Sequence, residues 1–289
     1  MHWLREEILK DASRENVGAG MVLRTDIASV VSYLEDEESN KDRWGFASET
    51  NIASESWDMG LGYEGALRMA LDGWPEGRKA LVESAARSGK RYGDQIQIEY
   101  DIQGVIPCVP TFLSGQPENM LQVTPQPVRP VCRVSVEFLI PGNVDAIAQA
   151  NYGAAILGAV ESLELQGVTV ELQGVCSSYG DSSCTNYAVT WPLKTEGQAL
   201  DIDRLAFTLG HTASSRRLVF GLVERCKELA DCGNGYGCCG GGGMILDDVD
   251  IALPRINNAI ANGADFMDTE NATKFVSGYF EANSQFSFH

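Results

Sequence analysis

The sequence predicts an α/β protein with a mixed, partly parallel sheet flanked by helices. A strand-like segment over 131–140 leads into a long helical segment over 144–166 and a second strand over 168–176. Strand, helix, strand in this order is typical of a parallel βαβ unit. A further strand over 185–191 follows the short stretch SSYGDSS, which indicates an antiparallel hairpin. With 289 residues, 44% of them hydrophobic, the chain is long enough for a sizeable core.

The first half is less regular, and we expect a loop-rich helical module there. Apolar spacing predicts helices over 3–10, 25–34 and 61–71. Pro75 marks the first turn of another helix, and alternation predicts a strand over 95–102. Six prolines between residues 103 and 130 indicate a long ordered loop without regular sheet or helix.

That proline-rich loop is our candidate for a domain boundary. We expect a module over 1–130 that packs on an α/β core over 131–289, the latter ending in a Gly/Cys-rich loop and a C-terminal extension. Small residues from Gly153 to Ala159 would let the long helix lie close to the sheet. Later elements are predicted as helices over 201–209 and 213–230, the second capped by Thr212, a strand over 244–246, a helix near 253–261 and a polar tail.

The charge balance restricts the classes of partner. The formal net charge is −18, from 40 acids against 22 bases, and such a surface repels nucleic-acid backbones. We therefore expect nucleic-acid contact only through a local basic patch. No apolar run approaches the roughly 20 residues of a membrane span, and the charged N-terminus is not a secretory signal. A cytoplasmic location with reduced cysteines is the expectation.

Histidine is scarce, so any catalytic site or metal site that needs a histidine would have to use a single residue. Two of the three histidines are terminal, which leaves His211 in the stretch HTASSRR. This stretch predicts a small anion site at a helix N-terminus. Its members would be His211, Thr212, Ser214, Ser215, Arg216 and Arg217. The alternative is a helix cap, with the two arginines paired to acids such as Asp201 or Asp203.

Two other groups of residues suggest sites and also have simpler explanations. Cys226, Cys232, Cys238 and Cys239 are clustered with the spacing C-x5-C-x5-C-C, which matches neither common zinc sites nor iron–sulfur sites. They form either a metal or redox site or a glycine-rich loop with free thiols, and we expect no cofactor. Trp44, Trp57 and Trp74 form either an aromatic interaction surface or large pieces of the core.

The stretch RVSVEFLIPGNVDAIAQANYGAAILGAVESLELQGVTVELQGV resembles the opening of a von Willebrand factor A-type domain. The resemblance implies a strand, loop, long helix and second strand. That family places a metal site, Asp-x-Ser-x-Ser, at the end of the first strand. This chain reads Ile140-Pro141-Gly142-Asn143-Val144 there, so the metal ligands are missing.

Several short sequence segments also resemble an uncharacterised group of tailed-phage proteins. They are the Trp-Gly at Trp44, GALRMALDGWPEG, PTFLSGQPENM, YGAAILGAVESLELQG and HTASSRRLVFGLVE. The resemblance implies a viral protein in the cytoplasm of an infected bacterium and assigns it no activity.

These observations lead us to expect a non-enzymatic binding or assembly protein. It would act through protein–protein contacts, with self-association among the possibilities, and without a membrane. One alternative is a nucleic-acid-associated accessory factor in phage replication or transcription, using a patch around Arg204, Arg216 and Arg217. The other is a metal or redox protein using the cysteine cluster.

Overall fold

The computed structural model describes most of the chain, in segments. They are residues 13–17, 20–36, 55–79, 82, 98–103, 106–123, 130–140, 142, 144–178, 186–225 and 249–283. Several predictions lie outside these segments. They are the helix over 3–10, the strand over 244–246, Trp44, and the cysteines at 226, 232, 238 and 239.

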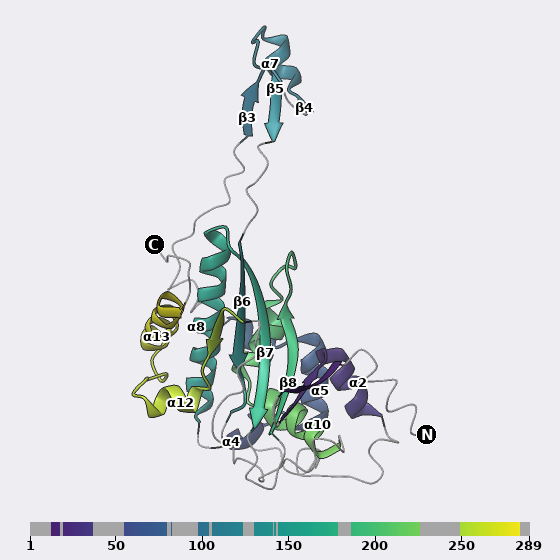
Figure 1. The fold of residues 1–289 in the computed structure, drawn as a ribbon, viewed down its shortest axis with the longest axis vertical. Coiled ribbons are helices and arrows are strands. Elements are labelled where there is room, and N and C mark those ends of the chain that lie inside the picture. The colour runs from purple at the N-terminus through teal and green to yellow at the C-terminus, as the bar shows by residue number, and fades with distance from the viewer. Residues whose placement is uncertain are drawn as a thin grey trace.

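A six-stranded mixed sheet forms the body of the molecule, in the order β1-β2-β8-β7-β6-β9 (Figure 1). β6 runs parallel to β7 and β9, and β2 runs parallel to β8. β7 and β8 are antiparallel, as are β1 and β2. The predicted mixed sheet is therefore confirmed. The strand bounds are β1 Ser13–Val17, β2 Gly20–Arg24, β6 Val131–Glu137, β7 Thr169–Ser178, β8 Asn186–Lys194 and β9 Ile251–Leu253.

The predicted βαβ unit is also confirmed, with α8 (Ala146–Leu165) between the parallel strands β6 and β7. Asp145 caps the helix, because its carboxylate accepts a hydrogen bond of 2.7 Å from the backbone N–H of Ile147. All nine residues from Tyr152 to Val160 are buried. A helix that is apolar all round is enclosed on several sides, and α8 contacts α9 (Ile202–Gly210) and α13 (Thr269–Asn283) as well as β7.

One of the small residues of α8 has a different role from the one predicted. A Cβ atom on Gly153 would lie 3.0 Å from the backbone oxygen of Leu209, which belongs to α9. The amide of Gln149, one turn earlier on α8, donates a hydrogen bond to the same oxygen. Gly153 therefore permits the close approach of two helices, and not the approach of a helix to the sheet.

The first part of the chain contributes to the same body. The helices predicted over 25–34 and 61–71 are confirmed as α2 (Ile27–Glu35) and α5 (Gly62–Asp72), and a short α4 (Glu55–Asp58) precedes α5. β2 hydrogen-bonds to β8, so the sheet includes strands from both sides of residue 130, where the sequence suggested a boundary.

Residues 98–123 form a small separate unit, which we call the arm (Figure 1). Its sheet has the order β3-β5-β4. The prediction of no regular structure over 103–130 was wrong, because prolines occur where their missing N–H is tolerated: Pro107 ends an edge strand and Pro110 lies in the first helical turn. The bounds are β3 Ile98–Asp101, β4 Ile106–Pro107, α7 Val109–Leu113 and β5 Met120–Val123.

The C-terminal segment is more ordered than predicted. The helix expected near 253–261 is present as α12 (Ile256–Ala261), but Leu253 belongs to β9. The expected polar tail contains the helix α13, which packs on α8. Ala272, Val276 and Phe280 recur at every fourth residue of α13, and each is 0% exposed. No helix in the described segments is long and apolar enough to span a membrane.

Candidate functional site

The residues of the predicted anion site lie in the protein interior. His211, Thr212, Ser214, Ser215, Arg216 and Arg217 are all at most 3% exposed. Four of them belong to the π-helix η1 (Ser214–Val219), which continues as α10 (Phe220–Arg225). The predicted cap by Thr212 was wrong: Ala213 occupies the cap position, and the Thr212 hydroxyl has no hydrogen-bond partner among the described atoms. Instead, the Ser214 hydroxyl donates to the backbone oxygens of Thr208 and His211, at 2.9 and 2.8 Å.

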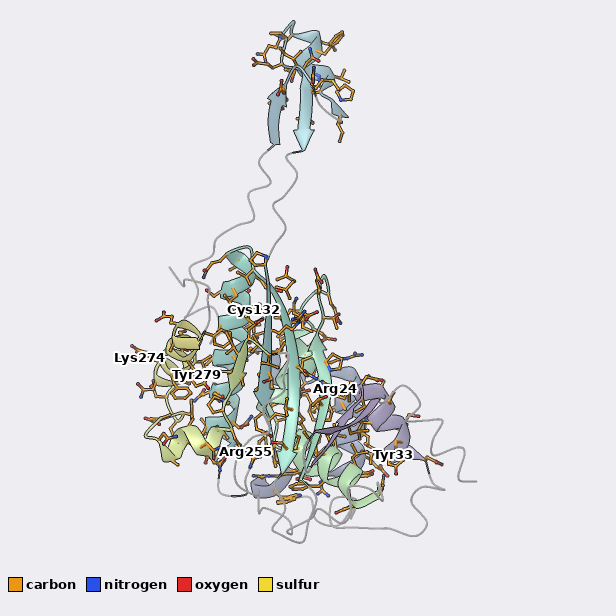
Figure 2. The ribbon with its side chains drawn as sticks, viewed as in Figure 1. Arg24, Tyr33, Cys132, Arg255, Lys274 and Tyr279 are labelled. Atoms are coloured by element: carbon orange, nitrogen blue, oxygen red, sulfur yellow. The ribbon has the colours of Figure 1, made fainter. Side chains whose placement is uncertain are left out.

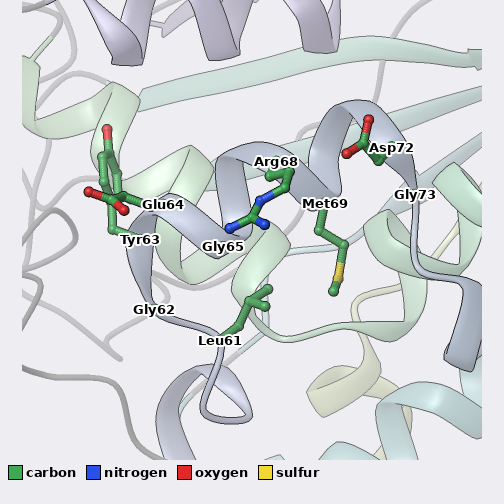
Figure 3. Close-up of a pocket in the computed structure, with 9 residues that line it drawn as sticks. All are labelled: Leu61, Gly62, Tyr63, Glu64, Gly65, Arg68, Met69, Asp72 and Gly73. Atoms are coloured by element: carbon green, nitrogen blue, oxygen red, sulfur yellow. The ribbon is translucent and has the colours of Figure 1, made fainter.

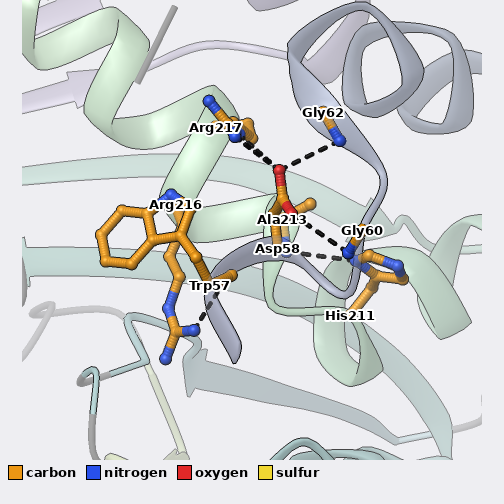
Figure 4. A network of polar contacts seen from close by, with 8 residues as sticks. All are labelled: Trp57, Asp58, Gly60, Gly62, His211, Ala213, Arg216 and Arg217. Carbon is orange, nitrogen blue, oxygen red and sulfur yellow. Dashed lines mark hydrogen bonds and ion pairs between the residues drawn. The ribbon is translucent and has the colours of Figure 1, made fainter. Parts of the chain in front are cut away.

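A buried ion pair dominates this region (Figure 4). Nε and Nη2 of Arg217 donate to Oδ2 of Asp58 at 2.8 and 2.6 Å, and both side chains are 0% exposed. The backbone N–H groups of Gly60 and Gly62 donate to the same carboxylate at 3.1 and 3.0 Å. Charged groups with several direct hydrogen bonds can be accommodated without water. The pair therefore fastens α4 to η1.

Arg216 makes a second link between the same two elements. Its Nη1 donates to the backbone oxygen of Trp57 at 2.6 Å, and its guanidinium lies 5.1 Å from the centre of the Trp57 ring. The indole also stacks on Phe220, with ring centroids 6.1 Å apart. Trp57 thus takes part in the interior packing, as does Trp74, whose ring meets that of His211 edge-on at 4.8 Å. This placement agrees with the core alternative for these two tryptophans.

His211 is a buried, neutral histidine. Burial lowers its pKa to about 4, against a smaller opposing effect of the Asp58 charge. Its Nδ1 accepts a hydrogen bond of 3.1 Å from the backbone N–H of Ala213, which fixes the proton on the other ring nitrogen. A neutral imidazole at neutral pH supplies no positive charge for an anion.

Arg216 and Arg217 are therefore bonded within the protein, as in the alternative to an anion site. Neither Asp201 nor Asp203 is the partner of Arg217. The partner of Arg217 is Asp58, which the sequence left unnoticed although Gly60 and Gly62 follow it in a pattern that exposes backbone N–H groups to its carboxylate. Arg204 is half exposed and pairs with Asp201 at 3.3 Å. The structure does not bring it onto one surface with the buried Arg216 and Arg217.

A second buried polar cluster lies where parallel strands end. Glu137 at the end of β6 accepts hydrogen bonds from the backbone N–H of Ser177 at 3.0 Å and from its hydroxyl. Nη2 of Arg255, shortly after β9, donates to the backbone oxygen of Ser177 at 2.5 Å and lies 3.7 Å from the Glu137 carboxylate. Arg255 is labelled in Figure 2. Burial raises the pKa of Glu137, while Arg255 and Ser177 oppose that shift. The contacts tie β6, β7 and the segment after β9 together.

An open groove of about 680 Å³ runs along α5 (Figure 3). Its charged residues Glu64, Arg68 and Asp72 recur at every fourth position and so follow one helix face. They alternate in sign and do not converge on a point in the groove. Among the residues that the structure describes, no group of three or more His, Cys, Asp or Glu side chains could hold a metal ion. The cysteine cluster lies outside those residues.

The arm is the part of the structure with the most exposed apolar side chains. Monomeric soluble proteins seldom present large contiguous apolar surfaces, and such surfaces usually contact other molecules. Of the eleven large hydrophobic residues that are exposed in the described segments, six belong to this short unit. They are Tyr100 (53% exposed), Ile102 (67%), Ile106 (52%), Val109 (60%), Phe112 (64%) and Leu113 (77%).

The pairing of the strands places part of this apolar surface on one face. Tyr100, Leu121 and Ile106 are directly opposite one another across β3, β5 and β4, and directly paired residues share a face of a sheet. We call them the apolar row. Asp101 and Met120 are paired at the neighbouring position, so they lie on the opposite face.

The arm carries charge of one sign. Between residues 98 and 123 the sequence has three acidic residues and no lysine or arginine. The apolar row itself contains no charged residue. Cys108, at the start of α7, accepts a hydrogen bond of 2.9 Å from the Thr111 hydroxyl, which together with a backbone contact lowers the pKa of this thiol.

Comparison with known proteins finds a family model for a domain of unknown function that matches residues 19–282. No curated protein and no solved structure matches the chain. The matched range contains the whole arm and every strand of the body's sheet except β1.

Proposed function

Since this chain belongs to the family described as Domain of unknown function (DUF7192), we propose from its own residues that it is a non-enzymatic binding or assembly protein. It acts through protein–protein contacts, and the arm makes them. The observation that carries this proposal is the exposed apolar surface of the arm, from Tyr100 to Leu113.

Burial of apolar surface is the main favourable term in protein association. Exposure of Phe112 and Leu113 to water is unfavourable in free energy, and their burial in a complex would therefore favour association. Aromatic residues are enriched at interfaces because one side chain covers a large area with few rotatable bonds. The arm offers two of them, Tyr100 and Phe112, each more than half exposed.

The other groups of polar residues favour binding over the alternative functions. Arg216 and Arg217 are bonded within the interior, so a nucleic-acid patch that depends on them lacks exposed charge. A phage origin and a location in the host cytoplasm remain predictions, which come from the short sequence segments that resemble tailed-phage proteins. The von Willebrand A-like character of the βαβ segment is likewise a proposal, which the order β6, α8, β7 supports.

Site-specific photo-crosslinking tests the proposal. A benzophenone amino acid replaces Phe112 in the full-length protein, and a matched probe replaces Ile260, which is 41% exposed on α12. In cells where the protein is naturally made, we expect protein crosslinks from position 112 and few from position 260. Equal yields at both positions, or none at 112, would contradict the proposal.

A further inference from the structure

We propose that the partner of the arm is a second copy of this chain, with the apolar rows of the two arms packed face to face. This inference rests on the proposed function, because it names the occupant of the same surface. Its first support is the composition of the apolar row. Tyr100, Leu121 and Ile106 carry no charge, so two such rows meet without placing like charges in contact.

The distribution of polar residues gives the second support. Asp101 lies on the face away from the apolar row, and Glu118 is exposed in the connection before β5. When two sheets pack face to face, their inner side chains are apolar and their outer faces are polar. One arm has the pattern of half such a sandwich. Its outer face would stay in water, with the acidic groups hydrated and apart.

The exposed area is the third support. If the full surface of a large side chain is roughly 200 Å², the six exposed apolar residues of the arm offer about 750 Å² of surface. A standard protein interface buries about 800 Å² on each partner. Tyr100 and Ile106 in the apolar row supply roughly 210 Å² of this area. The rest comes from Ile102 and α7, so a dimer of standard size buries α7 together with the two rows. A heterologous partner would also be served by this area, and the crosslinking experiment below distinguishes such a partner from a second copy.

The experiment measures the mass of the full-length protein by light scattering across a dilution series. We expect a dimer at roughly 10 µM that dissociates on dilution, which corresponds to a micromolar dissociation constant. The double variant Tyr100→Ser/Ile106→Ser should weaken dimerisation at least about tenfold, because both changes remove apolar area from the interface. Met120→Ser, on the opposite face, is the matched control and should leave the dissociation constant within about twofold.

A crosslinking experiment on the otherwise natural protein shows whether a loss of dimer in the double variant reflects an unfolded arm. A benzophenone amino acid at Leu113 in the otherwise natural protein should yield a product of twice the chain mass, joined to a peptide from residues 98–123 of the second copy. A protein that is monomeric at roughly 100 µM, or a crosslink that joins the arm only to the body of the second copy, would overturn the inference. If the protein is monomeric while its arm crosslinks to a different protein, the inference fails and the proposed function stands. If the arm crosslinks to nothing, both fail.

Discussion

At the scale of single residues, Asp58 and Arg217 form an ion pair in which both side chains are fully buried. Removal of one member of a buried ion pair is costly because the remaining charge is left without water or a counter-charge. The Asp58 carboxylate also accepts two backbone N–H groups that shape the turn into α5. Arg217 and Asp58 are 159 residues apart in sequence, so the pair connects distant parts of the chain.

We predict that Asp58→Asn lowers the free energy of unfolding by about 3–5 kcal/mol. The change keeps the shape of the side chain and removes its charge. Asp203→Asn is the control: Asp203 pairs with Arg78 at 3.3 Å, but the two side chains are 28% and 55% exposed. An exposed pair contributes at most about 1 kcal/mol. Urea denaturation of both variants measures the difference, and equal losses would refute the special role of the buried pair.

His211 gives the protein a defined pH dependence. Its pKa in the folded protein is about 4, below the value near 6.5 of an exposed histidine. Between these values the unfolded chain binds more protons than the folded one, so the stability supplied by neutral His211 is complete above pH 6.5 and is lost as the pH falls toward 4.

From this difference we expect His211 to account for a loss of about 2 kcal/mol of unfolding free energy between pH 7.5 and pH 5. His211→Gln retains a polar side chain that does not titrate, so the variant should lose correspondingly less stability over the same interval. Denaturant titrations of both proteins at the two pH values make the comparison. Parallel pH profiles would show that His211 is not the group responsible.

At the scale of elements, the close packing of helices against α8 decides how the body is built. Gly153 brings α8 against the end of α9, where the Leu209 oxygen meets both the glycine and the amide of Gln149. The C-terminal carbonyls of a helix lack partners within the helix, so Gln149 supplies one. On its other side α8 contacts α13, which buries Val276 and Phe280.

Two glycines in helix interiors should therefore respond in opposite ways to alanine. Gly153→Ala places a methyl group 3.0 Å from a backbone oxygen and should destabilise the protein by about 1–3 kcal/mol. Gly278→Ala in α13 meets nothing within 4 Å, and it should stabilise by about 0.5–1 kcal/mol because alanine is the better helix former. Thermal and urea unfolding measure both changes. A stabilising Gly153→Ala would refute the close contact of α8 with α9.

At the scale of the whole molecule, charge opposes the association that we propose for the arm. Each chain carries a formal net charge of −18, and like-charged bodies repel over distances of a Debye length. The apolar row contributes attraction that does not depend on charge. The balance between the two should be visible in the effect of salt.

We expect the dissociation constant of the dimer to fall as NaCl is raised from about 0.01 M to about 0.1 M, because the Debye length shrinks from about 30 Å to about 10 Å. Sedimentation velocity at several salt concentrations measures this. A contact held by opposite charges would respond in the reverse sense, and a dissociation constant that rises with salt would exclude the apolar pairing.

Local patterns in the sequence were sufficient to predict much of the body. The alternation of β6, the length of α8 and the short SSYGDSS connection each reflect the periodicity of one element, and they predict the mixed sheet. The polar composition of the C-terminal segment predicts a tail, whereas apolar residues that recur at every fourth position indicate the helix α13. In the arm, the alternation over 95–102 predicts β3, whereas β4, α7 and β5 lie in the proline-rich stretch, and proline content alone does not show where a proline is tolerated.

The candidate sites depended on long-range contacts. The sequence placed His211, Arg216 and Arg217 together, and it determined the strongly negative charge that argues against broad nucleic-acid binding. Only the tertiary structure decided that these residues are buried and that Arg217 pairs with Asp58, far away in the chain. It also decided that Tyr100 and Ile106 share an exposed face. The physical reason is that burial and pairing depend on which distant segment covers a side chain, and no local periodicity encodes that neighbour.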